Sequence, residues 1–134
     1  MPVPFRIGNL ASHPPRETLR VRATGEFLAD TYELTFGASL SRLVVHHETL
    51  APGRRASRPH SHTQREEIVL VLAGRPQVRI DDELHQLEAG DYVVFPAGTG
   101  VAHVLENDAS STTIAVYLLI ASAGHDDEIV PGAE

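Results

Sequence analysis

The chain of 134 residues contains no cysteine, no tryptophan and no lysine, so all 11 of its basic residues are arginine. Without cysteine, the protein has no disulfide scaffold, no thiolate-bound zinc or iron–sulfur cluster and no thiol nucleophile. Without lysine, it has neither Schiff-base chemistry nor the lysine-containing phosphate-binding loop. These absences exclude several large classes of enzyme and of structural metal site.

Long apolar segments and an excess of positive charge are missing as well. The longest apolar run, residues 114–121, is far shorter than the roughly 20 residues that a membrane helix needs. The first ten residues contain two prolines and no sustained apolar core, so they do not resemble a signal peptide. The formal net charge of −7 disfavours contact with phosphate backbones. We therefore expect a cytoplasmic protein that binds neither membranes nor nucleic acid.

From residue 39 onward, short apolar segments recur every 8 to 12 residues or so, separated by glycine, proline, aspartate and asparagine. The strands predicted from this pattern are 40–50, 67–72, 77–80, 83–87, 92–95, 102–106 and 112–120. Helical periodicity is missing from this region, so the pattern is typical of an all-β sandwich or small barrel. We expect an N-terminal arm over 1–36 that packs on a barrel over 37–121, and a loose, acidic tail over 122–134.

Two of the predicted strands are apolar on both faces. They are EIVLVL (67–72) and the run within 112–120. In a single thin sandwich, the outer face of such a strand would meet water, which is unfavourable for a continuous apolar surface. A second copy of the chain is a natural cover, so the sequence predicts a homodimer.

A pair of histidines is the first candidate for chemistry. His60 and His62 are two residues apart, and such residues point to the same side of an extended strand. Two parallel imidazoles suit one metal ion, although the spacing by itself favours an incidental surface pair. Glu67 opens the apolar run that follows, and a carboxylate there is costly to bury unless it is paired or bound to metal. The alternative, a solvated strand end, fits the neighbouring Glu66 better.

His103 lies in a second unit in which a break precedes a strand. Val101 and Leu105 flank it at alternate positions, a pattern that indicates an inward-facing side chain. A lone histidine in such a place is more often a hydrogen-bonded core residue than a ligand. For His103, both interpretations, a core histidine and a metal ligand, stay open.

Residues 53–74, GRRASRPHSHTQREEIVLVLAG, resemble the first motif of the cupin superfamily: Gly, a spacer, His-x-His, three or four residues, Glu, six residues, Gly. Residues 90–107, GDYVVFPAGTGVAHVLEN, resemble the second motif: Gly, five residues, Pro-x-Gly, a spacer, His, three residues, Asn. The first spacer here has six residues where five are usual. The spacer before His103 has four where two are commonest.

The resemblance implies a double-stranded β-helix, the cupin-type jelly-roll barrel, with a metal inside. It places His60, His62, Glu67 and His103 at the ligand positions of one divalent transition-metal ion. Three imidazoles and one carboxylate suit such an ion, and affinity alone discriminates poorly among first-row metals. Iron, manganese, nickel, copper and zinc therefore all remain open.

Five further residues are candidates around this site. His46 and His47 are adjacent on one predicted strand, so one of them points inward, either as a catalytic acid–base group or as a hydrogen-bonded core histidine. Arg54 and Arg58 precede the histidine pair, either as a solvated loop or as a cationic lip that binds substrate. Tyr92 is a candidate for the cavity or for an interface.

These features favour a metal-dependent enzyme that acts on a small organic substrate, through either dioxygenase or isomerase and decarboxylase chemistry. For the second chemistry, His46 or His47 would serve as the acid–base partner. The first alternative is a non-catalytic cupin that binds a small molecule or a metal, as a sensor does. The second is a metal-free structural barrel, which the retained set of four ligands disfavours.

Overall fold

The computed structural model describes residues 5–12 and 17–134, and these form two antiparallel sheets and one short 3₁₀ helix, η1 (Leu10–Ser12). The larger sheet contains, in spatial order, β1 (Glu17–Arg20), β2 (Phe27–Glu33), β3 (Leu43–Leu50), β10 (Ala115–Ser122), β5 (Glu67–Ala73) and β8 (Tyr92–Phe95). The smaller sheet contains β11 (Ile129–Pro131), β4 (His60–His62), β9 (His103–Glu106), β6 (Gln77–Ile80) and β7 (Glu83–Gln86).

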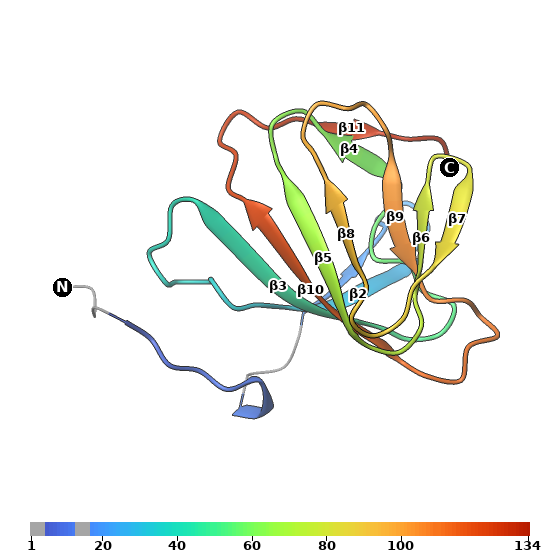
Figure 1. Ribbon diagram of the computed structural model, residues 1–134, viewed down its shortest axis with the longest axis horizontal. Coiled ribbons are helices and arrows are strands. Elements are labelled where there is room, and N and C mark those ends of the chain that lie inside the picture. Colours follow the sequence, from blue (N-terminus) through green and yellow to red (C-terminus); the bar gives the residue numbers. More distant parts are fainter. Residues whose placement is uncertain (1–4, 13–16) are drawn as a thin grey trace.

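The two sheets face each other and enclose the core, as Figure 1 shows. Strands that are distant in the sequence lie side by side, since β10 is inserted between β3 and β5. This order is that of a jelly roll: from β3 onward, successive strands alternate between the two sheets, except that β6 and β7 both lie in the smaller sheet. The all-β, double-stranded β-helix predicted above is therefore confirmed.

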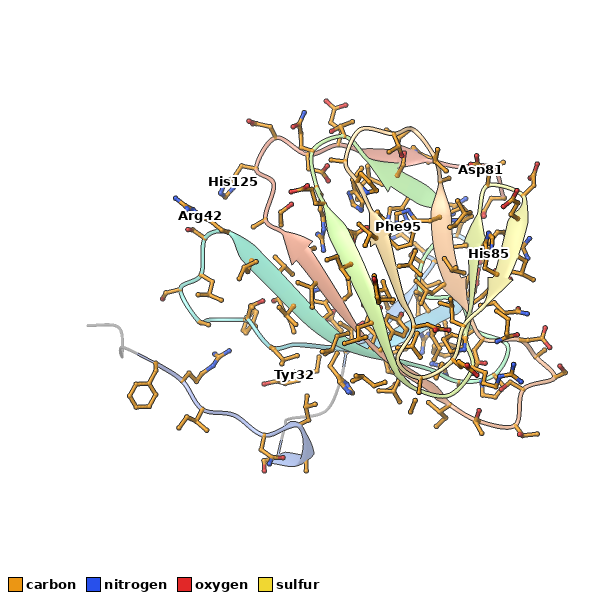
Figure 2. All side chains as sticks on the ribbon, in the orientation of Figure 1. Tyr32, Arg42, Asp81, His85, Phe95 and His125 are labelled. Carbon is orange, nitrogen blue, oxygen red and sulfur yellow. The ribbon has the colours of Figure 1, made fainter. Side chains whose placement is uncertain are left out.

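Alternation along the central strands decides which side chains enter the core. Val69 and Val71 on β5 pair across the ladder with Leu119 and Tyr117 on β10, and both valines are buried. Because residues two apart share a face, Glu67 lies on the same inward side as these valines. Figure 2 shows that side chains fill the space between the sheets, with Phe95 among them and with His85 and His125 at the periphery.

Glycines of the two motifs have specific structural tasks. Gly74 ends β5 with φ of +80°, and a Cβ atom there would lie 2.5 Å from the Ile114 carbonyl oxygen and 2.8 Å from Ala115 Cα. Only glycine fits this conformation and this close approach. Gly98 also has a positive φ, and its N–H donates to the His62 carbonyl at 2.9 Å. The turn after β8 is thereby tied to the strand that carries the histidine pair.

Both ends of the chain supply strands to the sheets. Within residues 1–36, β1 and β2 extend the larger sheet, while residues 1–4 and 13–16 lie outside the described part. The segment after residue 122 was expected to be loose, and here the structure differs, because β11 pairs with β4. Ladder pairing with β4 orders residues 129–131 as the edge strand of the smaller sheet. The division of the chain at residues 36 and 121 stays a prediction.

Over residues 5–12 and 17–134, the structure contains no helix with the length and apolar character that crossing a bilayer requires.

Candidate metal centre

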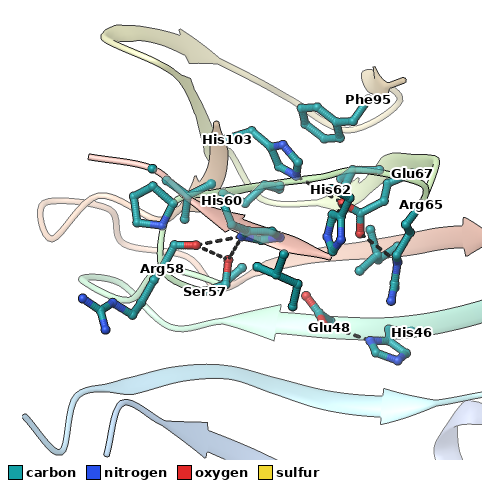
Figure 3. Close-up of a pocket in the computed structure, with 18 of the residues that line it drawn as sticks. His46, Glu48, Ser57, Arg58, His60, His62, Arg65, Glu67, Phe95 and His103 are labelled. Atoms are coloured by element: carbon teal, nitrogen blue, oxygen red, sulfur yellow. Dashed lines mark hydrogen bonds and ion pairs between the residues drawn. The ribbon is translucent and has the colours of Figure 1, made fainter. Parts of the chain in front are cut away.

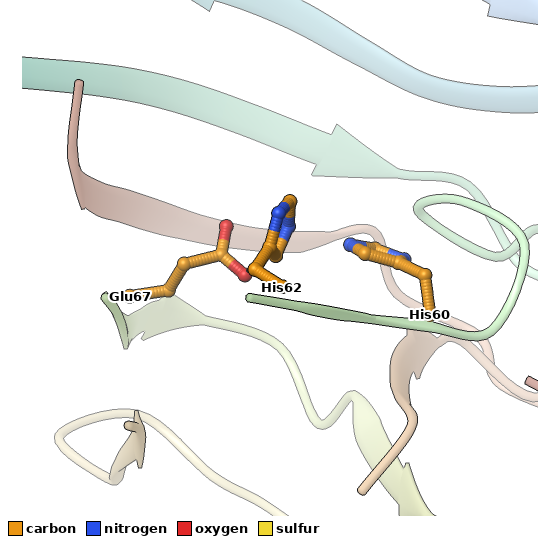
Figure 4. A group of neighbouring side chains, drawn as sticks. All are labelled: His60, His62 and Glu67. Atoms are coloured by element: carbon orange, nitrogen blue, oxygen red, sulfur yellow. The ribbon is translucent and has the colours of Figure 1, made fainter. Parts of the chain in front are cut away.

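Three strands bring the histidines and the carboxylate together. His60 and His62 lie at the two ends of the short strand β4 and point to the same side, and His60 pairs across the sheet with His103 on β9. Glu67 is the first residue of β5 in the opposite sheet. Figure 4 shows the carboxylate of Glu67 and the rings of His60 and His62 directed toward a common region. The centre thus lies between the sheets at one end of the barrel.

The distances fit a single ion. One ligand atom from each of His60, His62 and Glu67 can be chosen so that all lie within 4.8 Å of one another. Glu67 Oε1 lies 3.4 Å from His62 Nε2 and 3.2 Å from His103 Nε2, so the fourth predicted ligand adjoins this group. The ring centroids of His60 and His103 are 5.0 Å apart. Imidazole and carboxylate donors at this spacing suit a first-row divalent ion.

The electrostatics favour the ligand forms of these groups. Burial alone would raise the pKa of Glu67, but the hydrogen bond with His103 and the nearby His62 and Arg65 lower this pKa below its usual value. Burial lowers the pKa of His60, and His103 and His62 lower it further, against the opposing effect of the Arg58 carbonyl. An ionised carboxylate and a neutral imidazole are the forms that bind metal.

In the rings of His60 and His62, Nδ1 faces a hydrogen-bond acceptor and Nε2 faces the centre. His60 Nδ1 lies 2.8 Å from the Arg58 carbonyl oxygen, and His62 Nδ1 lies 2.7 Å from Asp127 Oδ2. The Nε2 atoms of both rings are then available to an ion. Phe95 stacks on the His103 ring with a centroid distance of 3.7 Å and an interplanar angle of 11°. Each histidine ring is therefore held in place without a metal.

Asp127 contacts His62 at the centre, and no sequence pattern pointed to it. Burial would raise its pKa, but hydrogen bonds from the backbone N–H groups of Gln64 and Arg65 and from His62 lower the pKa of Asp127 to about 2. It lies in a polar, acidic segment without a periodic pattern, so no local signal distinguishes it from Asp126 beside it. Only the pairing of β11 with β4 brings it to the centre.

A cavity of about 560 Å³ adjoins the four predicted ligands. His46 lines this cavity, whereas His47 is buried and is not among the described residues that line it. Both His46 and Glu48, which lie on β3, line the cavity, and Figure 3 shows the contact between their side chains. The acid–base candidate that the cavity can use is therefore His46.

Glu48 joins His46 to a buried network that the sequence analysis missed. Its Oε1 accepts a hydrogen bond from the Tyr117 hydroxyl at 2.5 Å, and its Oε2 lies 3.4 Å from His46 Nδ1. Glu33 lies 3.5 Å from His46 Nε2. The hydrogen bond with Glu48 raises the pKa of His46. Burial opposes this effect, and the negative charges of Glu48 and Glu33 add to it. The sequence contains one signal for this pair, because His46 and Glu48 are two residues apart and so share a face of the strand.

The two candidate arginines lie in different places. Arg58 lines the cavity mouth, where its Nε lies 3.0 Å from Glu134 Oε1. Arg54 lies beside Asp30 and is not among the described residues that line the cavity. Arg65 does line it, and its buried Nε finds no hydrogen-bond partner within the described part of the chain. That Nε is 3.5 Å from Glu67 Oε2, so Arg65 is the cation nearest the ligand set.

Tyr92 lies away from these groups. It begins β8 with its side chain on the outer face of the larger sheet, where 69% of its surface is exposed. It alternates with the inward-facing Val93 and Phe95, and it is not among the described residues around the cavity. Tyr92 is therefore not a cavity residue, and its role at an interface stays a prediction.

The barrel and the histidine–glutamate cluster inside it define a class of small, single-domain β-barrel proteins. Residues 46–120 match the family model of the cupin domain, which is more than half of the chain. The chain belongs to the cupin family, as the two motifs predicted.

Three relatives illustrate what the chain is similar to. It is 27% identical over 111 residues to a quercetin 2,3-dioxygenase of Bacillus subtilis (strain 168), a match that covers 82% of this chain and 28% of that relative. This chain thus spans little more than a quarter of that protein. A sugar phosphate isomerase of the cupin superfamily from Silicibacter pomeroyi aligns with a TM-score of 0.81 and 23% identity over 94% of this chain and 81% of the other. The polyketide cyclase RemF from Streptomyces resistomycificus aligns with a TM-score of 0.75 and 16% identity, covering 95% and 84%.

Proposed function

We propose that this protein is a metal-dependent enzyme that acts on a small organic molecule bound in the cavity. His60, His62, Glu67 and His103 would hold one divalent transition-metal ion. The observation that carries the proposal is the convergence of these four side chains at the wall of a cavity large enough for a ligand. Such an ion, when bound, would polarise a carbonyl, orient a chelating substrate or activate dioxygen.

His46 is the proposed acid–base residue. It faces the cavity, and the carboxylates of Glu48 and Glu33 stabilise its protonated form. A histidine with a raised pKa holds a proton near neutral pH and can pass it to a substrate or accept one. Tyr117 and Thr31 donate hydrogen bonds to Glu48, so this carboxylate stays fixed beside the ring. Isomerase or decarboxylase chemistry would use this proton, and dioxygenase chemistry would use the group to orient the substrate.

The substrate we propose has an apolar body and an anionic or enolic oxygen. The cavity wall includes Val69, Leu105 and Leu119, which favour an apolar or aromatic portion. Arg65 supplies a positive charge beside the ligand set and has an unsatisfied donor, which an anionic oxygen would pair with. Arg58 at the mouth is already paired with Glu134, so it contributes less to substrate binding.

The relatives support an enzyme without selecting one reaction. The support comes from the sequence match to a dioxygenase, whereas the likeness to the isomerase and the cyclase extends to the fold alone. The same barrel therefore hosts several chemistries, and the choice among them depends on the metal and on the residues around the cavity.

The experiment begins with protein purified without a histidine tag and stripped of metal. Separate samples are loaded anaerobically with Fe²⁺, Mn²⁺, Ni²⁺, Cu²⁺ or Zn²⁺. Each is assayed for oxygen uptake with chelating enols such as flavonols, and for isomerisation or decarboxylation of small oxo acids and sugar phosphates. We expect turnover with one metal class, and loss of turnover in His62→Ala.

The variant His46→Gln separates the two chemistries. It should abolish isomerase or decarboxylase turnover while retaining the metal, whereas Tyr92→Phe, outside the cavity, should change neither. Tight binding of such compounds by the loaded protein with no turnover would favour the non-catalytic alternative. Failure of the chain to retain any of the five ions would refute the proposal.

We further propose that the protein is a homodimer formed through the outer face of the larger sheet. Ile68 and Val94 are paired there across β5 and β8, and they are 41% and 54% exposed. Leu72 and Tyr92 add to this surface with 43% and 69% exposure. The partly buried Leu118 and Ile120 on β10 continue it toward β3. An apolar sheet face of this extent is unfavourable in water.

Sedimentation or light scattering tests this proposal. We expect wild-type protein to have the mass of two chains, and Val94→Asp to dissociate it because a carboxylate would be buried at the interface. The control is Leu84→Asp, which places the same charge at a 44% exposed leucine on β7 of the other sheet and should remain dimeric. A wild-type protein of monomer mass at all concentrations would contradict the proposal.

A further inference from the structure

We infer that Asp127, in the segment after β10, is a positioning residue of the metal centre, and that it fixes His62 in the tautomer that presents Nε2 to the ion. The inference rests on the proposed metal site. It also assigns a task to the C-terminal segment, which reaches the centre from the far end of the sequence.

Three hydrogen bonds hold the Asp127 carboxylate. Oδ1 accepts from the backbone N–H groups of Gln64 and Arg65 at 2.8 and 2.9 Å, and Oδ2 lies 2.7 Å from His62 Nδ1. The first two bonds cap the turn that joins the strand of His62 to the strand of Glu67. Asp127 therefore orients one ligand directly and fixes the connection between two ligands.

The surrounding segment holds Asp127 rigidly against that turn. Thr63 N–H donates to the Glu128 carbonyl at 3.1 Å, and Glu128 N–H donates to Thr63 Oγ1 at 2.9 Å. Gly124 packs so closely that a Cβ atom at that position would lie 3.1 Å from Asp127 Cβ. The strand β11 then continues in register along β4. The position of the carboxylate is thus set by the close packing of Gly124 before it and by hydrogen bonding and strand pairing after it.

A carboxylate acceptor at Nδ1 determines the chemistry at Nε2. An ionised carboxylate can only accept hydrogen bonds, so the proton of a neutral His62 ring lies on Nδ1 and the lone pair lies on Nε2. Nε2 is the atom that faces Glu67 Oε1 at 3.4 Å. The carboxylate also fixes the orientation of the ring, and losing such a partner typically weakens metal binding. His60 differs, because a neighbouring backbone carbonyl, that of Arg58, lies at its Nδ1.

The variant Asp127→Asn inverts this hydrogen bond while it preserves the turn. In the variant, the amide oxygen keeps both backbone donors, because an NH₂ group cannot accept them. The NH₂ group then faces His62 Nδ1 and donates to it. The proton of the ring must move to Nε2, and that nitrogen loses the lone pair that the ion needs.

Two measurements test the inference. The first is ¹⁵N NMR of the His62 ring in metal-free protein at pH 8, which identifies the protonated nitrogen. We expect Nδ1–H in the wild type and Nε2–H in Asp127→Asn. The second is Co²⁺ affinity by competition with a chelator, which should fall about 10- to 100-fold in the variant. The control, Asp126→Asn, removes the same charge from the exposed neighbour and should leave both readouts unchanged.

The outcomes separate this inference from the proposed function. A wild-type protein that binds no Co²⁺ but shows His62 as Nδ1–H would refute the metal site and retain the orienting role of Asp127. A wild-type ring protonated at Nε2, or a Co²⁺ affinity of Asp127→Asn within twofold of Asp126→Asn, would overturn the inference. The wild-type NMR measurement decides the tautomer even if Asp127→Asn fails to fold.

Discussion

The Tyr117 hydroxyl is a sensitive place to test the buried network at the cavity wall. Its side chain is only 1% exposed, and the hydroxyl donates to Glu48 Oε1 at 2.5 Å. The substitution Tyr117→Phe keeps the ring in the core and removes only this donor. It therefore isolates the hydrogen bond from the packing of the ring.

The magnitude follows from the charge and burial of the acceptor. A hydrogen bond to a charged group contributes about 1.5–3 kcal/mol to the free energy of unfolding. Removing the donor costs an amount near the upper end of that range when the acceptor is left buried and unpaired. Glu48 is 8% exposed, so water cannot readily replace the lost hydroxyl. We predict that Tyr117→Phe lowers the free energy of unfolding by about 2–3 kcal/mol. For a chain of this size, that corresponds to a fall in Tm of roughly 6–15 °C.

Urea and thermal unfolding of metal-free protein measure this effect. The control is Tyr92→Phe, which removes the same hydroxyl from a 69% exposed side chain and should change the free energy of unfolding by less than about 0.5 kcal/mol. If the two variants unfold with equal free energies, Glu48 does not depend on Tyr117, and the proposed acid–base network lacks its support.

Two further predictions concern the fold and its pH dependence. Gly74→Ala should prevent folding or lower the free energy of unfolding by more than about 2 kcal/mol, because the residue has a left-handed conformation and the added Cβ would meet the Ile114 carbonyl. The control in thermal unfolding is Gly90→Ala, which is also at positive φ but has open space around it. Because Glu48 and Glu33 raise the pKa of His46 above its ordinary value, its stabilising contribution is complete below about pH 6.5 and is lost as pH rises through the raised pKa. The stability of wild-type protein relative to His46→Gln, measured by urea unfolding with a chelator present, should therefore be greater at pH 6 than at pH 8, and a difference that grows with pH would contradict this.

The parts of the site that could be predicted from the sequence are local. His60 and His62 share a face because they are two residues apart, and Glu67 shares a face with Val69 for the same reason. The strands 77–80 and 92–95 were also predicted at their observed bounds, since turn residues flank each of them. Spacing within one strand, together with the two motifs, is enough to identify these features.

The parts that could not be predicted depend on pairing between distant segments. Asp127 reaches His62 across 65 residues, and the Tyr117 hydroxyl reaches Glu48 across 69. The acidic composition of the last residues indicated solvent exposure, and the register of β11 against β4 overrides that indication. Arg65 lies in the polar turn between β4 and β5, and only the path of that turn directs its side chain toward the cavity. Such partners follow from the three-dimensional register, which short-range patterns do not specify.

The most direct test of the metal centre is the anomalous difference map of a crystal grown with Co²⁺. We predict one strong peak per chain, about 2.0–2.2 Å from Nε2 of His60, His62 and His103 and from a carboxylate oxygen of Glu67. The same map for His62→Ala should show this peak lost or greatly weakened while both sheets are retained. A wild-type map without a peak between these four side chains, or with its only peaks at the protein surface, would contradict the account.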